Sequence, residues 1–188
     1  MKIYYREKSG GIEILRCFGI EGRVEIPGMI DDKLVISAAP YAFSSHMDEK
    51  EDLKNASLWE VSEGLEFGRE EHVLAGNDVE EIVFPDTLKE IGRYIFYGCG
   101  NLKKLEFSDS LMQIGCGAFT GCHALEKLTV HMRQGKKSGV KEMLGEMWQR
   151  IDVNFLYEYE EARLVFPEHY DEAVSYTHLR AHETGAYL

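Results

Sequence analysis

A repeat of 23 residues is the feature that most constrains what this chain can fold into. Residues 82–104 read IVFPDTLKEIGRYIFYGCGNLKK and residues 105–127 read LEFSDSLMQIGCGAFTGCHALEK; they align without a gap, and 10 of the 23 positions are identical. A unit this short cannot bury its own apolar side, so equivalent units have to stack on one another to form a core. The period therefore predicts a solenoid in which Phe96 stacks on Phe119.

Each copy contains one short strand followed by turns. Apolar residues recur with a fixed spacing, as in Leu102, Leu105 and Phe107, and the last two of the three alternate with a period of two. That alternation is typical of a strand with one buried face. Gly92 and Gly115 then mark turns. We expect the strands to stack side by side as a parallel sheet.

Weaker copies precede the two clear ones. Residues 59–79 keep the apolar register, with Trp59 aligned to Ile82, and would form a worn third copy. A more distant copy, VEIPGMIDDKLVISAAPYAFSSH, spans residues 24–46, where the sequence Tyr-Ala-Phe ending at Phe43 corresponds to the Gly-Ala-Phe ending at Phe119.

The pattern IG..AF.GC..L..L.F resembles the BspA-like leucine-rich repeats. The resemblance is close over residues 79–130 and weaker over residues 24–78, and the N-terminal segment is similar to the lead-in strands that precede such repeats. It implies an α/β leucine-rich-repeat solenoid of short parallel strands. It also implies a protein-interaction scaffold, often found on bacterial surfaces, that carries no catalytic residues.

The periodicity changes after Lys137. In SGVKEMLGEMWQRIDV, which starts at Ser138, apolar residues fall at positions i, i+3, i+4, i+7, i+8 and i+11 from Val140, which predicts an amphipathic helix with Ser138 as its N-cap. Such a helix would cap the open end of the solenoid. We therefore expect three parts. Residues 1–137 would form the solenoid with its lead-in strands, and residues 175–188 would be a non-native tail. Between them, residues 138–174 would form a helical cap and the possible start of a truncated second unit.

The tail contains the sequence SYTHLRAHET, residues 175–184. His178 and His182 are four apart, which is the spacing of zinc ligands on a helix. The segment continues neither the repeat nor the helical stripe, however, and it resembles translated linker or adapter sequence. We expect foreign residues from about Ser175 onward and no metal site there.

Charge and hydropathy narrow the classes of partner. The chain has 33 acidic and 21 basic residues, a net charge of -12, which repels phosphate backbones and argues against nucleic acid as a partner. No run of 18 apolar residues and no signal-peptide pattern occurs, so no membrane span is expected. The chain as written would be cytosolic, or a cell-surface protein if the chain is incomplete.

The cysteines are candidate metal ligands or nucleophiles. Cys99 and Cys122 occupy the same repeat position, which favours small core-filling side chains, and no cysteine has a second cysteine at zinc-site spacing. We expect no cofactor and no metal. The alternative is a metal-dependent or cysteine hydrolase, and its candidate pairs would join Cys116 or Cys122 to His123, His131 or His72.

The strand positions that point away from the core form the candidate binding site. A stack of strands presents a continuous row of such side chains without a single reactive group. The predicted site consists of Val83, Glu106 and Thr129, flanked by Glu81, Lys104 and Lys127. These residues would contact another protein. A structural fragment of a longer bacterial surface protein is a further alternative.

Overall fold

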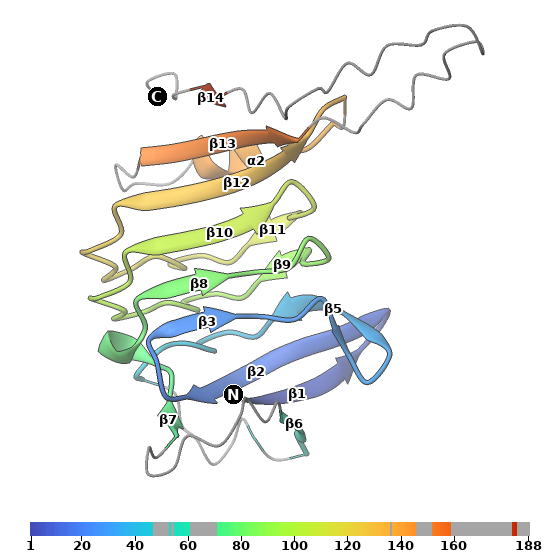
Figure 1. The fold of residues 1–188 in the computed structure, drawn as a ribbon, viewed down its shortest axis with the longest axis vertical. Coiled ribbons are helices and arrows are strands. Elements are labelled where there is room, and N and C mark those ends of the chain that lie inside the picture. Colours follow the sequence, from blue (N-terminus) through green and yellow to red (C-terminus); the bar gives the residue numbers. More distant parts are fainter. Residues whose placement is uncertain are drawn as a thin grey trace, which may run out of the picture.

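The computed structural model describes residues 1–46, 53, 55–60, 71–135, 137–145, 152–158 and 182–183. Short strands stack in the order of the sequence and form one wall of the solenoid (Figure 1). These strands are β3 (Arg23–Glu25), β8 (Glu81–Val83), β10 (Lys104–Ser108), β12 (Lys127–Arg133) and β13 (Asp152–Glu158), all parallel. The two-residue strand β14 (His182–Glu183) pairs antiparallel with β13. The parallel sheet predicted from the repeat is confirmed.

A second sheet forms the opposite wall and extends into the N-terminal segment. Its repeat strands are β5 (Lys33–Ala38), β9 (Glu90–Ile91) and β11 (Gln113–Ile114), which are parallel to one another. Its N-terminal strands are β1 (Lys2–Lys8) and β2 (Gly11–Gly19), an antiparallel hairpin whose β2 runs beside β5. The shorter elements are β4 (Met29–Ile30), β6 (Ser57–Glu60), β7 (His72–Val73) and the 3-10 helix η1 (Gly76–Asp78). The predicted lead-in strands are therefore present.

The core is a ladder of equivalent side chains from successive coils. The rings of Phe43 and Phe96 lie 5.9 Å apart between centroids, and those of Phe96 and Phe119 lie 5.7 Å apart. All three rings are buried. This confirms the predicted stacking, and it places the distant copy, residues 24–46, directly against the clear repeats.

The prediction of a worn copy over residues 59–79 is wrong. Trp59 lies in β6 and pairs with Ile3 of β1, whereas the strand neighbour of Ile82 is Val24 in β3. The reason is burial. Residues 24–46 supply apolar side chains at the core positions of a coil, whereas three of the four residues of β6 are exposed.

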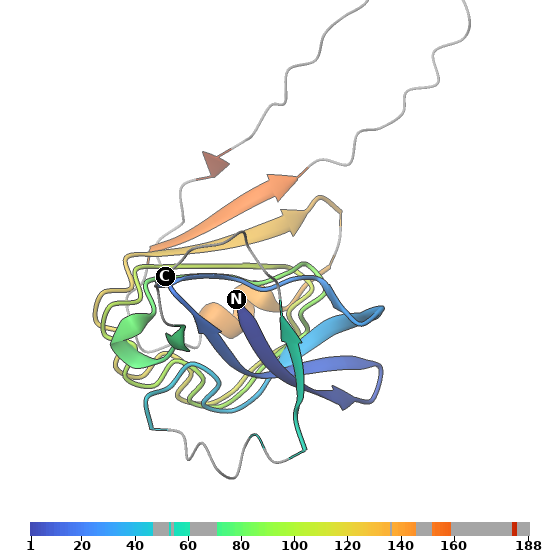
Figure 2. The same cartoon turned by 60° about the horizontal axis from the view of Figure 1, so that its bottom comes forward.

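The chain continues past residue 137 with a helix and one more strand. In α2 (Val140–Gly145), Val140 and Leu144 are buried in the core, and viewed along the stack the helix lies within the outline of the coils (Figure 2). The Val140 N–H donates to the side chain of Ser138 at 3.3 Å, as predicted for an N-cap. The later residues of the predicted stripe, 146–151, lie outside the described part of the chain, as does the region around Pro167.

β13 then joins the sheet beside β12, with seven residue pairs in register. The parallel sheet thus extends beyond the segment in which the sequence shows the repeat. In the described parts of the chain, no helix is both long and apolar enough to cross a membrane.

Candidate interaction surface

The outer face of the parallel sheet carries rows of side chains from equivalent repeat positions. In β10, Leu105 and Phe107 point into the core, so Lys104 and Glu106 belong to the outer face. The strand register places Glu81, Lys104 and Lys127 in one row. The residues two positions later on the same strands form the next row: Val83, Glu106 and Thr129. The structure thus brings the six predicted site residues into two adjacent rows.

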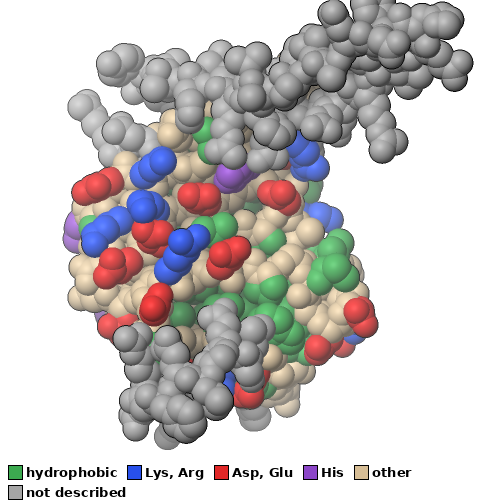
Figure 3. Space-filling model, in the orientation of Figure 1, with side chains coloured by type: hydrophobic (Ala, Val, Ile, Leu, Met, Phe, Trp, Pro, Cys, Tyr) green, Lys and Arg blue, Asp and Glu red, His purple; other side chains and the backbone are tan. Residues whose placement is uncertain are grey.

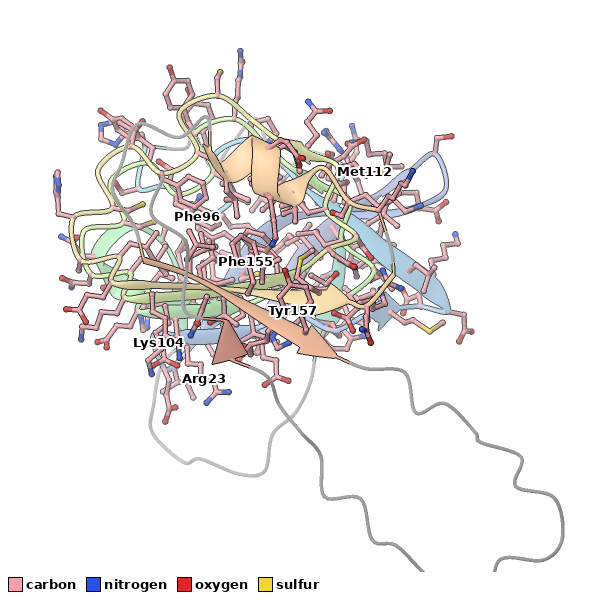
Figure 4. The ribbon with its side chains drawn as sticks, turned by 90° about the horizontal axis from the view of Figure 1, so that it is seen from above. Arg23, Phe96, Lys104, Met112, Phe155 and Tyr157 are labelled. Atoms are coloured by element: carbon pink, nitrogen blue, oxygen red, sulfur yellow. The ribbon has the colours of Figure 1, made fainter. Side chains whose placement is uncertain are left out.

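The rows extend beyond the predicted residues at both ends of the sheet, to β3 at one end and to β13 at the other. Arg23 pairs in register with Glu81, and Glu25 with Val83, so β3 contributes to the same face. Figure 4 shows Arg23 and Lys104 on one side of the molecule. An alignment of residues 23–46 on residues 81–104 would have identified these two residues.

Charges of opposite sign meet across the pairing of β8 with β10. The Lys104 ammonium lies 2.6 Å from the Glu81 carboxylate, and its hydrogen bond lowers the pKa of Glu81. One position earlier, Lys103 lies 3.2 Å from Glu80. Exposed pairs of this kind contribute about 0–1 kcal/mol each to stability. The result is a surface of interleaved charge (Figure 3) rather than a patch of one sign.

His131 belongs to this face, although the sequence singled it out only as a candidate base for a thiol. Its Nε2 lies 3.3 Å from a carboxylate oxygen of Glu106, and the two side chains are 30% and 34% exposed. His131 follows Thr129 by two residues, so strand alternation would have placed it on the outer face.

Thr129 does not offer the exposed side chain that was predicted. It is 3% exposed. The residues in register with it are Glu106 on β10 and Asn154 on β13, and both have longer side chains than threonine. The repeat pattern does not predict β13 as a neighbour of Thr129. Val83 is half-buried.

Cys99 and Cys122 fill the core, as predicted. The Cys99 thiol donates to the carbonyl of Phe43 at 3.2 Å, and the Cys122 thiol donates to the carbonyl of Phe96 at 3.3 Å. Burial raises the pKa of each thiol to about 12. Neither is therefore poised as a thiolate nucleophile near neutral pH.

The residues needed for a metal centre do not come together where the structure describes them. Within those ranges, no three His, Cys, Asp or Glu side chains are placed to hold an ion. His178 lies outside the residues that the structure describes. Of His182, the structure describes only the backbone, as part of β14.

The fold is a leucine-rich-repeat solenoid. Its coils of about 23 residues stack on one another, its parallel sheet has repeating outer rows, and its core is a ladder of equivalent residues. Residues 70–139 match the family model of a BspA type leucine-rich repeat region of six copies. This match confirms the resemblance to the BspA-like leucine-rich repeats that the sequence shows.

Two solved structures are similar to the chain. One is a leucine-rich cell surface protein from Faecalibacterium prausnitzii, with 19% identity and a TM-score of 0.42 over 69% of this chain and 30% of that protein. The other is a leucine-rich repeat protein from T. pallidum, with 19% identity and a TM-score of 0.32 over 74% of this chain and 76% of that protein. The chain thus spans less than a third of the F. prausnitzii protein. None of the curated proteins matches it.

Proposed function

We propose that this chain is a non-catalytic protein-interaction module that binds its partner through the outer face of the parallel sheet. The observation that carries the proposal is the alignment of Glu81, Lys104 and Lys127 across three strands, beside a second row that includes Glu106. Because the rows follow the strand spacing, they present charges at regular intervals over a wide area. Repeat proteins commonly bind through extended surfaces of this kind.

The charge pattern favours a protein over nucleic acid. The chain carries a net charge of -12, which opposes binding to a phosphate backbone. The outer face itself carries basic residues beside acidic ones, as the pairs of Lys104 with Glu81 and of His131 with Glu106 illustrate. A partner protein can match such a pattern charge by charge, which gives specificity for the partner.

The state of the thiols weighs against the cysteine-hydrolase alternative. Cys17, Cys99 and Cys122 are buried, and burial raises the pKa of each to about 12. Cys116 is exposed, and the sequence around it belongs to the structural repeat. The location of the chain, in the cytosol or at the cell surface, stays a prediction.

Charge reversal on the outer face tests the proposal. We expect Lys104→Glu and Glu106→Lys each to lower the recovery of a captured partner by at least about fivefold, which corresponds to about 1 kcal/mol of binding free energy. The measurement is quantitative affinity capture from the source cells with wild-type and variant bait. The melting temperature should change little, because both side chains take part only in partly exposed ion pairs.

Lys89→Glu is the matched control. Lys89 is exposed but immediately precedes β9, a strand of the opposite sheet, so reversing its charge should leave partner recovery unchanged. Equal recovery with Lys104→Glu, Glu106→Lys and wild type would contradict the proposed binding face.

A further inference from the structure

Two large apolar side chains are exposed side by side at one border of the outer face. Met29 and Leu34 pair directly across the β4–β5 hairpin and are 53% and 45% exposed. Directly opposed residues of an antiparallel pair lie on the same face, so these two side chains form one surface. Their neighbours Ile30 and Val35 point the other way and are buried.

Hydrogen bonds hold this hairpin against the end of β8. The Ile26 N–H donates to the Val83 carbonyl at 2.9 Å, and the Thr87 hydroxyl donates to the Val35 carbonyl at 2.7 Å. A Cβ atom on Gly28 would lie 3.7 Å from the Pro85 ring, which places the start of the hairpin in contact with the second residue after β8. The hairpin thus adjoins the row that contains Val83.

We name the surface formed by Met29, Leu34, Val83 and Pro85 the apolar border. Figure 3 shows hydrophobic side chains gathered at the lower right of this face, next to the interleaved charges. Isolated exposed apolar residues are common on proteins, but contiguous groups next to a polar rim mark interaction sites. The apolar border therefore adds an anchor to the charged rows.

Acidic residues lie around the apolar border. Asp31 and Asp32 form the exposed turn of the hairpin, and Asp86 follows Pro85. Glu25 is in register with Val83 and lies 3.9 Å from Arg23. Asp31 accepts a hydrogen bond from the Tyr5 hydroxyl. Asp32 and Asp86 form no ion pair with any other residue that the structure describes, so their charges are available to a partner.

We propose that the apolar border binds a segment of another protein that presents an apolar side chain flanked by Lys or Arg. The inference rests on the proposed function and specifies the chemistry of its partner. The apolar side chain would cover Met29 and Leu34, where burial of apolar area favours association. Flanking basic groups would meet Asp32 and Asp86. A second copy of this chain fits poorly, because it would bring two acidic rims and two net charges of -12 together.

A peptide selection tests this inference. A phage-displayed library of random peptides is panned against the full chain, and the affinity of an enriched peptide is measured by fluorescence polarisation. We expect enriched peptides to combine an apolar residue with Lys or Arg. Met29→Ser or Leu34→Ser should weaken binding at least about tenfold, the loss typical of a truncated interface anchor. Binding should also weaken as salt is raised.

Met112→Ser is the matched control. Met112 is 74% exposed, more than Met29, and lies away from the side that carries Arg23 and Lys104 (Figure 4). Its substitution should leave peptide affinity unchanged. Because Met29, Leu34 and Met112 are all exposed, none of the three substitutions removes a core side chain.

Several outcomes would overturn the inference. One is enrichment of acidic or purely polar peptides. Another is a loss of peptide affinity with Met112→Ser as large as the loss with Met29→Ser. A third is self-association of the wild-type chain that Met29→Ser abolishes. If Met29→Ser and Leu34→Ser bind the peptide normally while Lys104→Glu binds it weakly, the apolar border is not the binding site and the proposed function stands. If all three bind normally, both fail.

Discussion

At the scale of the residue, the same side chain recurs where successive coils place it in the same surroundings. Phe96 and Phe119 stack on one another, and Cys99 and Cys122 each donate to the carbonyl of the phenylalanine one coil earlier. A buried thiol fills a narrow position without leaving its weak donor unpaired. The cysteines of the repeat are therefore part of the core.

Native alkylation tests this assignment of the cysteines. At about pH 8, iodoacetamide should label one cysteine, Cys116, because it is exposed while Cys17, Cys99 and Cys122 are buried with pKa values of about 12. All four should react after unfolding in denaturant. Rapid labelling of Cys99 or Cys122 in the folded chain, read by mass spectrometry, would show that these thiols are not core residues.

The same pKa values predict alkaline sensitivity. The pKa of each buried thiol is raised from 9.0 in the unfolded chain to about 12 in the folded one. The stability that this contributes is complete below about pH 9 and is lost as the pH rises through about 12. Urea unfolding should therefore show a free energy that falls by about 1 kcal/mol per buried thiol between about pH 8 and pH 10. A constant free energy over that range would contradict these pKa values.

At the scale of the element, the repeat glycines set the distance between coils. A Cβ on Gly115 would lie 2.2 Å from the Arg93 nitrogen, and a Cβ on Gly92 would lie 2.3 Å from the Pro40 nitrogen. These are backbone atoms of the preceding coil, which cannot move aside as a flexible side chain can. Glycine is required here because the coils approach closely.

Gly115→Ala should therefore destabilise the fold by about 1–3 kcal/mol, the usual cost of overpacking a rigid contact. Gly139→Ala is the control, because a Cβ at that position meets nothing within 4 Å, and it should change stability by no more than about 0.5 kcal/mol. Urea unfolding of both variants measures the difference. Equal free energies of unfolding for Gly115→Ala and Gly139→Ala would mean that the backbones of adjacent coils lie further apart than these distances indicate.

Strand pairing could be predicted from the sequence only where coils are equal in length. The gapless repeat predicts that Lys104 lies beside Lys127, because both occupy the same position in adjacent coils. The pairing of Val24 with Ile82 spans an insertion between two coils, so no fixed period indicates it. The antiparallel pairing of β6 with β1 depends on packing at the N-terminal end, which local sequence does not encode.

At the scale of the whole molecule, the candidate surface was predicted in part. Its two rows follow the period and could be read from the repeat, whereas the burial of Thr129 depends on β13, a strand without the repeat pattern. The apolar border arises because a hairpin inside one longer coil folds against the end of β8. The charged rows are thus a property of the repeat, and the apolar border is a property of one coil.

Lysine footprinting of the bound chain tests the central claim, that the outer face of the parallel sheet is the binding surface. Acetylation rates are measured by mass spectrometry for the free chain and for the chain saturated with its captured partner. The account predicts that Lys104 and Lys127, in one row of that face, react more slowly when the partner is bound, while Lys89 reacts at an unchanged rate. Protection of Lys89, with Lys104 and Lys127 reacting as in the free chain, would contradict it.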